Sequence, residues 1–327
     1  MEQQWTEEGF FLDEDDFEEK MNTEGAVFRQ EHYRDGYFSG YQEKKIHYTA
    51  VQHPKEKAAI VICHGFCEFI HKYDELIWYL YRLGYSVYFI DHRGHGFSQR
   101  EVEDPGKVYV DDFEEYVKDL KIFLDEIVKK QSPDAKLFLF AHSMGGAIGT
   151  LFLEQYPTYF KAVVLSSPMM EMSYGKIPKP AVKLLAAWSA VAHWNTRYVP
   201  GQHGYKDEYD FDGSSSLSEA RYRYVNQYRK EVPQYRTYSA TYAWARAALK
   251  AERRLQKDAS KVQIPALLCQ AGKDTMVRPK AQEEFAKKAK NTIIERYPDS
   301  KHEIFNAKDE ERIGFYKRIF EFYEEML

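Results

Sequence analysis

The chain has 327 residues, of which 44% are hydrophobic, 30% charged and 16% aromatic, and its formal net charge is −5. This length suits one large domain, or a domain with an insertion, that can bury a deep pocket. Because the chain has no basic stripe and no RNA-binding signature to offset phosphate charge, we expect no nucleic-acid partner.

The acidic residues are concentrated at the start of the chain. Residues 1–20 carry nine acidic side chains and one lysine, a local charge of −8 that leaves +3 for the remainder. This stretch lacks the features of a signal peptide, and no run approaches the roughly 18 apolar residues of a membrane span. We therefore expect a soluble, cytoplasmic protein. The sequence leaves open a transient contact with the inner face of a membrane, and it does not determine the oligomeric state.

The chain offers no pattern that is typical of a metal or cofactor site. The three cysteines, Cys63, Cys67 and Cys269, fit a reducing compartment, and no second Cys/His pair completes a zinc site. No H-E-x-x-H is present, and "SMGGAIG" has the wrong glycine spacing for a dinucleotide fingerprint. We expect a protein without cofactor or metal.

Taken in chain order, short apolar runs alternate with amphipathic segments. Residues 36–51 predict a hairpin, residues 112–130 predict a helix with one apolar face, and six runs predict further strands at 58–64, 86–92, 136–142, 162–167, 266–272 and 291–297. Near-continuous apolar strands between amphipathic helices indicate an α/β fold. The prediction is a mostly parallel, eight-stranded sheet with helices on both faces.

The alternation is interrupted once, by about a hundred residues between two strands. This insertion, residues 168–263, is far longer than the connections typical of such folds. It contains ten tyrosines and three tryptophans, and residues 179–195 predict a largely apolar helix. We expect an acidic extension (1–25), a two-part core (26–167 and 264–327) and an inserted helical cap (168–263).

Three residues that follow successive strands could form a catalytic triad. Open parallel sheets bind ligands beyond the carboxyl ends of their strands, and Ser143, Asp274 and His302 all occupy such positions. A serine hydroxyl needs a base to take its proton, and the base needs an acid to orient it. Each residue taken singly could be a helix cap or a solvated loop residue. Together, in this order, they predict a nucleophile, an acid and a base.

Acyl transfer also needs donors for the developing oxyanion. We expect these to be the backbone amides of Met144, directly after the nucleophile, and of Phe66, in the loop after the first parallel strand. His64, Gly65 and Glu68 would support that loop, and a plain turn is the alternative interpretation. His142 is expected to pack beside the nucleophile rather than to act as a base.

The nucleophile motif departs from its usual form, G-x-S-x-G, at one position. The first position is Ala141, in the stretch "AHSMGG". The position needs a small side chain because the following helix packs against the strand, so we expect one methyl group to be accommodated.

These motifs carry a family resemblance. The chain resembles the α/β-hydrolases of the monoacylglycerol lipase and bacterial lysophospholipase group, often labelled with the serine aminopeptidases. The resemblance runs from about Gly36 and rests on "HGFCE", "DHRGHGFS", "AHSMGG", "AGKDTMV" and "SKHEIF". It implies a serine carboxylic-ester hydrolase that cleaves a lysophospholipid or monoacylglycerol through an acyl-enzyme.

The resemblance extends into the insertion, with departures. It puts Arg223 and Tyr224 on a family Arg-Tyr pair, and Thr241 and Trp244 on residues near the site. "YSAT" stands where relatives commonly have G-G-P-T, and Cys67 stands where the lipases often have glycine. A short-chain or aryl-ester esterase, an iminopeptidase-like peptidase and a non-catalytic receptor on the same fold are the alternatives.

Overall fold

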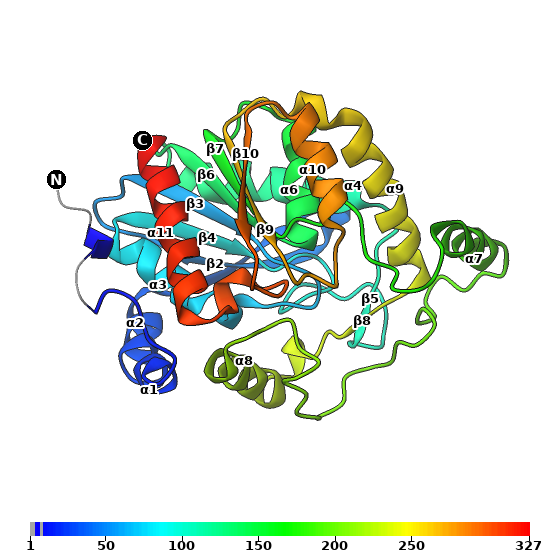
Figure 1. Ribbon diagram of the computed structural model, residues 1–327, viewed down its shortest axis with the longest axis horizontal. Coiled ribbons are helices and arrows are strands. Elements are labelled where there is room, and N and C mark those ends of the chain that lie inside the picture. The colour runs from blue at the N-terminus through cyan, green and yellow to red at the C-terminus, as the bar shows by residue number, and fades with distance from the viewer. Residues whose placement is uncertain (1–3, 7–8) are drawn as a thin grey trace.

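An eight-stranded sheet forms the centre of the protein, whose computed structural model describes residues 4–6 and 9–327 (Figure 1). β1 and β2 form the hairpin, β2 also pairs antiparallel with β4, and the remaining neighbours are parallel. The predicted mostly parallel sheet is therefore confirmed. In spatial order the strands are Arg34–Ser39 (β1), Lys45–Val51 (β2), Tyr85–Ile90 (β4), Ala58–Cys63 (β3), Leu137–His142 (β6), Ala162–Ser166 (β7), Ala266–Ala271 (β9) and Thr292–Tyr297 (β10).

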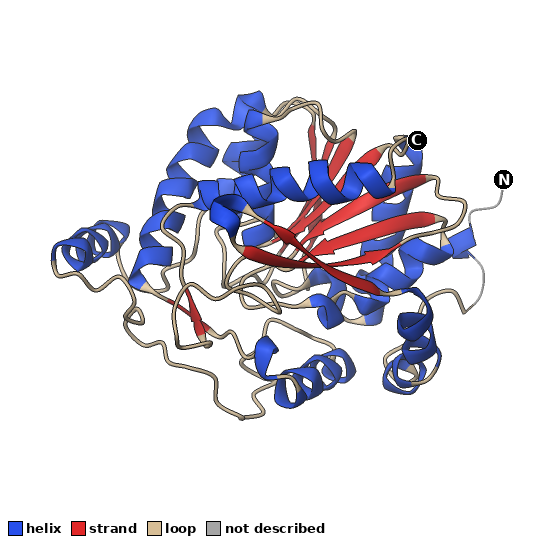
Figure 2. Ribbon diagram, turned by 180° about the vertical axis from the view of Figure 1, so that it is seen from behind, coloured by secondary structure: helices blue, strands red, loops and turns tan. Residues whose placement is uncertain are grey.

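Helices cover both faces of this sheet (Figures 1 and 2). Side chains of α3 (Asp74–Arg82) and α11 (Asp309–Glu325) share one apolar core with one face of the strands. A second core, on the other face, is formed with α4, α6, α9 and α10. These four helices span Phe113–Phe123, Met144–Gln155, Tyr242–Asp258 and Pro279–Lys288.

The central strands are apolar on both sides because each side faces a core. Every residue of β3 is buried, with Ala59 and Val61 in one core and Ile60 and Ile62 in the other.

The predicted helix at 112–130 begins where the Asp112 side chain accepts a hydrogen bond from the Glu114 amide. It continues through a wider turn, Leu124–Val128, into the short α5 (Lys129–Gln131).

The inserted segment contributes both to the cap and to the core. α7 (Lys179–Val191) and α8 (Glu219–Glu231) stand away from the sheet, and β8 (Ser239–Ala240) pairs with the equally short β5 (Lys107–Val108). α9 instead packs against α6 and α10 and contributes to the core. We therefore propose that the cap ends near the start of α9 and that this helix belongs to the hydrolase core.

The acidic N-terminal segment is folded against the body of the protein. Trp5, Phe10, Leu12 and Phe17 are buried, and the segment forms α1 (Phe17–Asn22) and α2 (Glu24–His32). Residues 1–3 and 7–8 of the expected extension lie outside the described residues. Among the described residues, no helix is both long enough and apolar enough to cross a membrane.

Candidate active site

Ser143 lies at the sharp corner between β6 and α6. Its backbone has φ 51° and ψ −115°, a conformation that L-residues rarely adopt and that functional sites often hold under strain. The strand ends at His142 and the helix begins at Met144, so the serine alone makes the turn. The Ser143 amide donates to the Ser166 carbonyl of the neighbouring strand at 3.0 Å, which fixes the corner to the sheet.

Two glycines after the serine let the helix approach the sheet closely. A Cβ on Gly145 would lie 2.1 Å from the Cys63 carbonyl oxygen, and one on Gly146 would lie 2.7 Å from the Pro168 ring. Ala141 is buried, and its methyl group would meet a Cβ on Gly149 at 3.3 Å. The small residues in this motif are therefore needed for close packing between helix and strand.

The three residues expected to form a triad lie within hydrogen-bonding distance of one another. His302 Nε2 is 2.8 Å from Ser143 Oγ, and His302 Nδ1 is 2.7 Å from Asp274 Oδ2. Asp274 follows β9 and His302 follows β10, so the parallel sheet brings the three side chains to one edge. A serine, an imidazole and a carboxylate in this order can move a proton from the hydroxyl to the ring.

The Asp274 carboxylate is held in its charged form. Burial would raise the pKa of Asp274, but the hydrogen bond and charge of His302 and the amides of Val277 and Met276 together lower it. These two amides donate to Asp274 Oδ1 at 3.1 and 2.7 Å. The carboxylate is thus ionised at neutral pH and oriented toward the imidazole.

The loop after β3 is held by Glu68, as its sequence position suggests. The Glu68 carboxylate accepts from the Gly65 amide at 2.6 Å, from the Tyr73 hydroxyl at 2.5 Å and from Lys72 Nζ at 2.8 Å. Although burial alone would raise the pKa of Glu68, Lys72 and these hydrogen bonds hold it well below its usual range. A Cβ on Gly65 would meet that carboxylate at 2.7 Å, so the loop has little freedom. Sequence reasoning missed Lys72, although its position four residues after Glu68 is a usable signal.

Cys67 adopts the backbone conformation that explains why glycine is common at its position. Its φ is 59°, in the left-handed region, and its side chain is buried. The loop therefore keeps a glycine-like backbone although it carries a side chain.

Residues 54–309 match the family model described as serine aminopeptidase, S33. The chain belongs to this family. The Escherichia coli K12 protein named lysophospholipase L2 is 32% identical over 250 residues, which cover 76% of this chain and 73% of that protein. A Haemophilus influenzae protein named probable lysophospholipase L2 is 29% identical, covering 86% of this chain and 90% of its own length.

The fold agrees with a solved structure of similar shape. The crystal structure of Paleococcus ferrophilus monoacylglycerol lipase matches with a TM-score of 0.67 and 24% identity, over 86% of this chain and 99% of that chain. The predicted resemblance and the α/β-hydrolase fold are confirmed, and the protein is a serine hydrolase. In the part of the chain that the structure describes, no group of three or more His, Cys, Asp or Glu side chains could hold a metal ion.

Other buried histidines lie near the site of this S33-family hydrolase. The hydrogen bonds of the His64 and His142 rings go to groups outside the triad, unlike those of His302. Burial lowers the pKa of His142 to about 4, although nearby Glu68 opposes this, so its ring is neutral at pH 7. That ring lies 4.9 Å from the His302 ring. His64 Nε2 accepts from the His92 amide at 3.0 Å, and burial lowers the pKa of both rings. These residues support the site as neutral groups.

Thr241 and Trp244 lie at the N-terminus of α9, beside the loop after β3. Thr241 donates to the Val108 carbonyl at 2.8 Å and accepts from the Trp244 amide at 3.3 Å, which caps the helix. The Trp244 ring lies 4.5 Å from the Phe66 ring. Trp244 therefore lies between this loop and an apolar pocket whose wall it helps to form.

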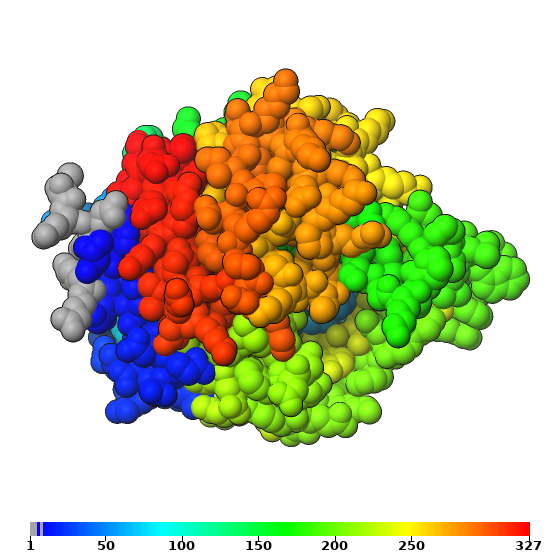
Figure 3. Space-filling view, viewed as in Figure 1, coloured from blue at the N-terminus to red at the C-terminus, as the bar shows by residue number. Residues whose placement is uncertain are grey.

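A large apolar pocket lies between α7 and α9. Its volume is about 610 Å³, and Trp244 forms part of its wall. Small and aliphatic residues supply much of the lining, among them Ile177 just before α7, Val182, Leu185 and Ala186 of α7, and Ala245 and Leu249 of α9. The face shown in Figure 3 is hollowed between the green segment that contains α7 and the orange segment that follows β9.

Arg223 and Tyr224, which the resemblance puts on a family Arg-Tyr pair with a substrate-binding or site-shaping role, point in different directions from α8. Arg223 points to the surface and pairs with Glu18 at 3.0 Å, whereas Tyr224 is buried and donates to Asp74 at 2.7 Å. Residues two positions apart on a helix point in directions about 200° apart around its axis, so Arg221 and Arg223 lie on opposite faces of α8. Arg221 is the one that points inward. Arg221 is 1% exposed and binds Glu75 at 2.7 Å. The two inward-facing side chains, Arg221 and Tyr224, bind carboxylates of α3 rather than residues of the triad.

Proposed function

We propose that this protein is a serine carboxylic-ester hydrolase that cleaves single-chain acyl lipids, a lysophospholipid or a monoacylglycerol. The observation that carries the proposal is the continuous hydrogen-bonded line Ser143–His302–Asp274 at a strained strand-to-helix corner. The apolar pocket beside Trp244 supports the choice of an acyl substrate. The lysophospholipase L2 relatives support the same substrate class.

The proposed reaction proceeds in two halves. Ser143 Oγ attacks the ester carbonyl carbon while His302 Nε2 takes the hydroxyl proton, and Asp274 stabilises the imidazolium that forms. The amides of Phe66 and Met144 are the proposed donors to the oxyanion. As the carbonyl re-forms, the bond to the leaving alcohol breaks and His302 returns the proton to that alcohol. Water, deprotonated by His302, then attacks the acyl carbonyl carbon, and as the ester bond to Ser143 Oγ breaks His302 returns the proton to that oxygen, which releases the fatty acid and free Ser143.

The acyl chain would lie in the 610 Å³ pocket between α7 and α9. Each CH₂ group that enters such a pocket gains about 0.8 kcal/mol from leaving water. Binding should therefore strengthen with chain length until the pocket is filled. A peptide bond to proline offers no comparable apolar tail.

The outer surface of α7 supports transient contact with a lipid surface. Leu184, Trp188 and Val191 of this helix are 73%, 58% and 72% exposed. Ile177, just before the helix, is 59% exposed. Exposed apolar side chains grouped on one helix are unusual on a soluble surface and are typical of interaction sites. We propose that this helix contacts the membrane or micelle from which the substrate is drawn.

A fluorophosphonate probe tests the nucleophile. We expect covalent labelling of the wild type and none of Ser143→Ala. Ser167→Ala is the matched control, because Ser167 is also buried, also has positive φ (42°), and has no hydrogen-bond partner for its hydroxyl among the described residues. Loss of labelling in the control together with retention in Ser143→Ala would refute the assignment.

Chain-length profiling tests the substrate class. We expect kcat/KM to rise from acetyl to long-chain acyl glycerols or lysolipids and to be negligible for prolyl amides. Activity that peaks on acetyl esters or prolyl amides, with long-chain lysolipids untouched, would refute the lipid proposal.

A further inference from the structure

The N-terminal segment lies between the cap and the body of the protein. Residues 9–32, here called the N-terminal strap, contact α8 on one side and α3 on the other. Figure 3 shows the blue strap in direct contact with the yellow-green cap. Phe17 packs edge to face on Tyr224 of α8, with ring centroids 5.5 Å apart.

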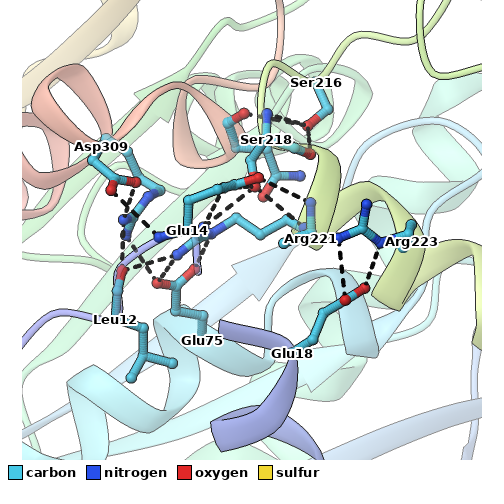
Figure 4. A network of polar contacts seen from close by, with 12 residues as sticks. Leu12, Glu14, Glu18, Glu75, Ser216, Ser218, Arg221, Arg223 and Asp309 are labelled. Carbon is cyan, nitrogen blue, oxygen red and sulfur yellow. Dashed lines mark hydrogen bonds and ion pairs between the residues drawn. The ribbon is translucent and has the colours of Figure 1, made fainter. Parts of the chain in front are cut away.

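The strap completes a buried cluster of charges (Figure 4). Glu75 of α3 binds Arg221 of α8 at 2.7 Å and Arg312 of α11 at 3.0 Å, so one buried carboxylate faces two buried guanidinium groups. Asp309 of α11 pairs with Arg312 at 2.8 Å, and from the strap the Leu12 carbonyl accepts from both arginines, at 3.2 and 2.6 Å. Glu14, whose side chain is 38% exposed, adds a third carboxylate at the rim of the cluster, 3.1 Å from Arg221.

Glu14 also caps α8 directly. Its carboxylate accepts from the Ser218 hydroxyl at 2.5 Å and from the Ala220 amide at 2.9 Å, at the first turn of the helix. A carboxylate at a helix N-terminus satisfies free amides and interacts favourably with the helix dipole. Glu14 therefore ties the start of α8 to the strap through the helix backbone as well as through Arg221.

The other end of α8 reaches the loop expected to hold the oxyanion. Arg229 donates from Nη2 to the Cys67 carbonyl at 2.8 Å, next to Phe66 and within the left-handed turn. Eight residues of helix separate Arg221 from Arg229, a rise of about 12 Å. A single rigid element thus joins the strap to the loop after β3.

We propose that Glu14 and Arg229 are positioning residues for the reaction: the strap sets the position of α8, and α8 in turn holds the oxyanion loop through the Cys67 carbonyl. This proposal rests on the proposed function for its kinetic consequence, but the mechanical link itself does not depend on catalysis. Loss of the link should lower kcat, because a loop that fluctuates presents the Phe66 amide at the wrong place.

Hydrogen exchange tests the link without any activity. We expect Glu14→Ala to speed amide exchange in both α8 and residues 64–68. Glu18→Ala is the matched control, because Glu18 lies on the same strap and pairs with Arg223 of the same helix, but that pair is exposed. Exchange in Glu14→Ala that equals that of Glu18→Ala in both segments would overturn the proposal.

Kinetics on a soluble butyrate ester test the consequence. We expect kcat to fall roughly tenfold in Glu14→Ala and in Arg229→Met, since displacement of an oxyanion donor is a milder change than its removal, which costs about 10²-fold or more. Arg229→Lys should recover part of the rate. The double variant should be no slower than Arg229→Met alone, because both changes interrupt one link. Fully additive losses, or a change in KM with kcat unaltered, would overturn the proposal.

The two proposals fail in distinguishable ways. If the wild type hydrolyses no ester and Ser143 is not labelled, the proposed function fails, while the exchange experiment still reports on the link. If the wild type is active and Glu14→Ala behaves like Glu18→Ala, the link fails and the proposed function stands.

Discussion

Gly145→Ala would place a methyl group where the start of α6 meets the end of β3. The new Cβ would lie 2.1 Å from the Cys63 oxygen, 2.5 Å from the Cys63 carbonyl carbon and 2.6 Å from the His64 oxygen. All three are backbone atoms, so no side chain can rotate away. Since the shortest tolerable Cβ contact is about 3.0 Å, the start of α6 and the loop after β3 must separate by about 1 Å.

That displacement opens the space between the two proposed oxyanion donors. The Met144 amide lies on the helix that moves and the Phe66 amide on the loop that moves. A misplacement of about 1 Å can cost about 10²-fold in rate, so we expect kcat for a butyrate ester to fall by that factor. The fold should persist, because alanine in a helix is favoured over glycine by about 1 kcal/mol.

Gly149→Ala is the matched control on the same helix. Its Cβ would meet the end of the Leu139 side chain at 2.8 Å, and a flexible side chain can adjust. We expect its kcat to stay within about threefold of the wild type. Wild-type kcat at an unchanged Tm in Gly145→Ala, or an equal loss of activity in both variants, would contradict this account of the corner.

Three further predictions concern the corner, the pocket and a buried carboxylate. Ala141→Gly should change kcat by less than about twofold, because only one methyl group that packs near Gly149 is lost; a large loss in steady-state turnover would contradict this. Ala245→Phe fills part of the apolar pocket, so kcat/KM should fall for long-chain esters and stay unchanged for butyrate, whereas an unchanged chain-length profile would place the acyl chain elsewhere. Burial raises the pKa of Glu154 from 4.5 to about 8, opposed by Arg254. Because the folded protein then keeps a proton that the unfolded chain releases, the contribution of Glu154 to wild-type stability should fall as the pH rises from 4.5 to 8. Thermal unfolding should therefore show Glu154→Gln gaining Tm at pH 8 and not at pH 4, and an equal gain at both would contradict the assignment.

Most of the fold and the candidate triad could be predicted from the sequence because both depend on local patterns. Alternation of apolar runs with amphipathic helices indicates a parallel sheet, and parallel strands end at one edge. Any polar residue directly after such a strand is therefore a candidate for the same site. Ser143, Asp274 and His302 could be grouped in this way without coordinates.

The orientation of α8 could not be predicted from the resemblance. Arg221, Arg223 and Tyr224 lie within four residues, and which of them points inward depends on the rotation of the helix about its axis. That rotation is set by Glu75 and Asp74 of α3, about 150 positions away in the chain. A motif aligned by residue type carries no information about it.

The order of apolar and polar residues along the chain is enough to predict the sheet, its covering helices and the residues that follow each strand. The contacts of the acidic N-terminal segment, in contrast, could not be predicted before the fold was known. The sequence names no partner for the acidic side chains of this segment. The fold places one of them, Glu14, against Arg221, 207 positions later in the chain. A charge is stabilised by the groups that lie within a few ångströms of it, and groups from distant parts of the chain come that close only in the folded protein.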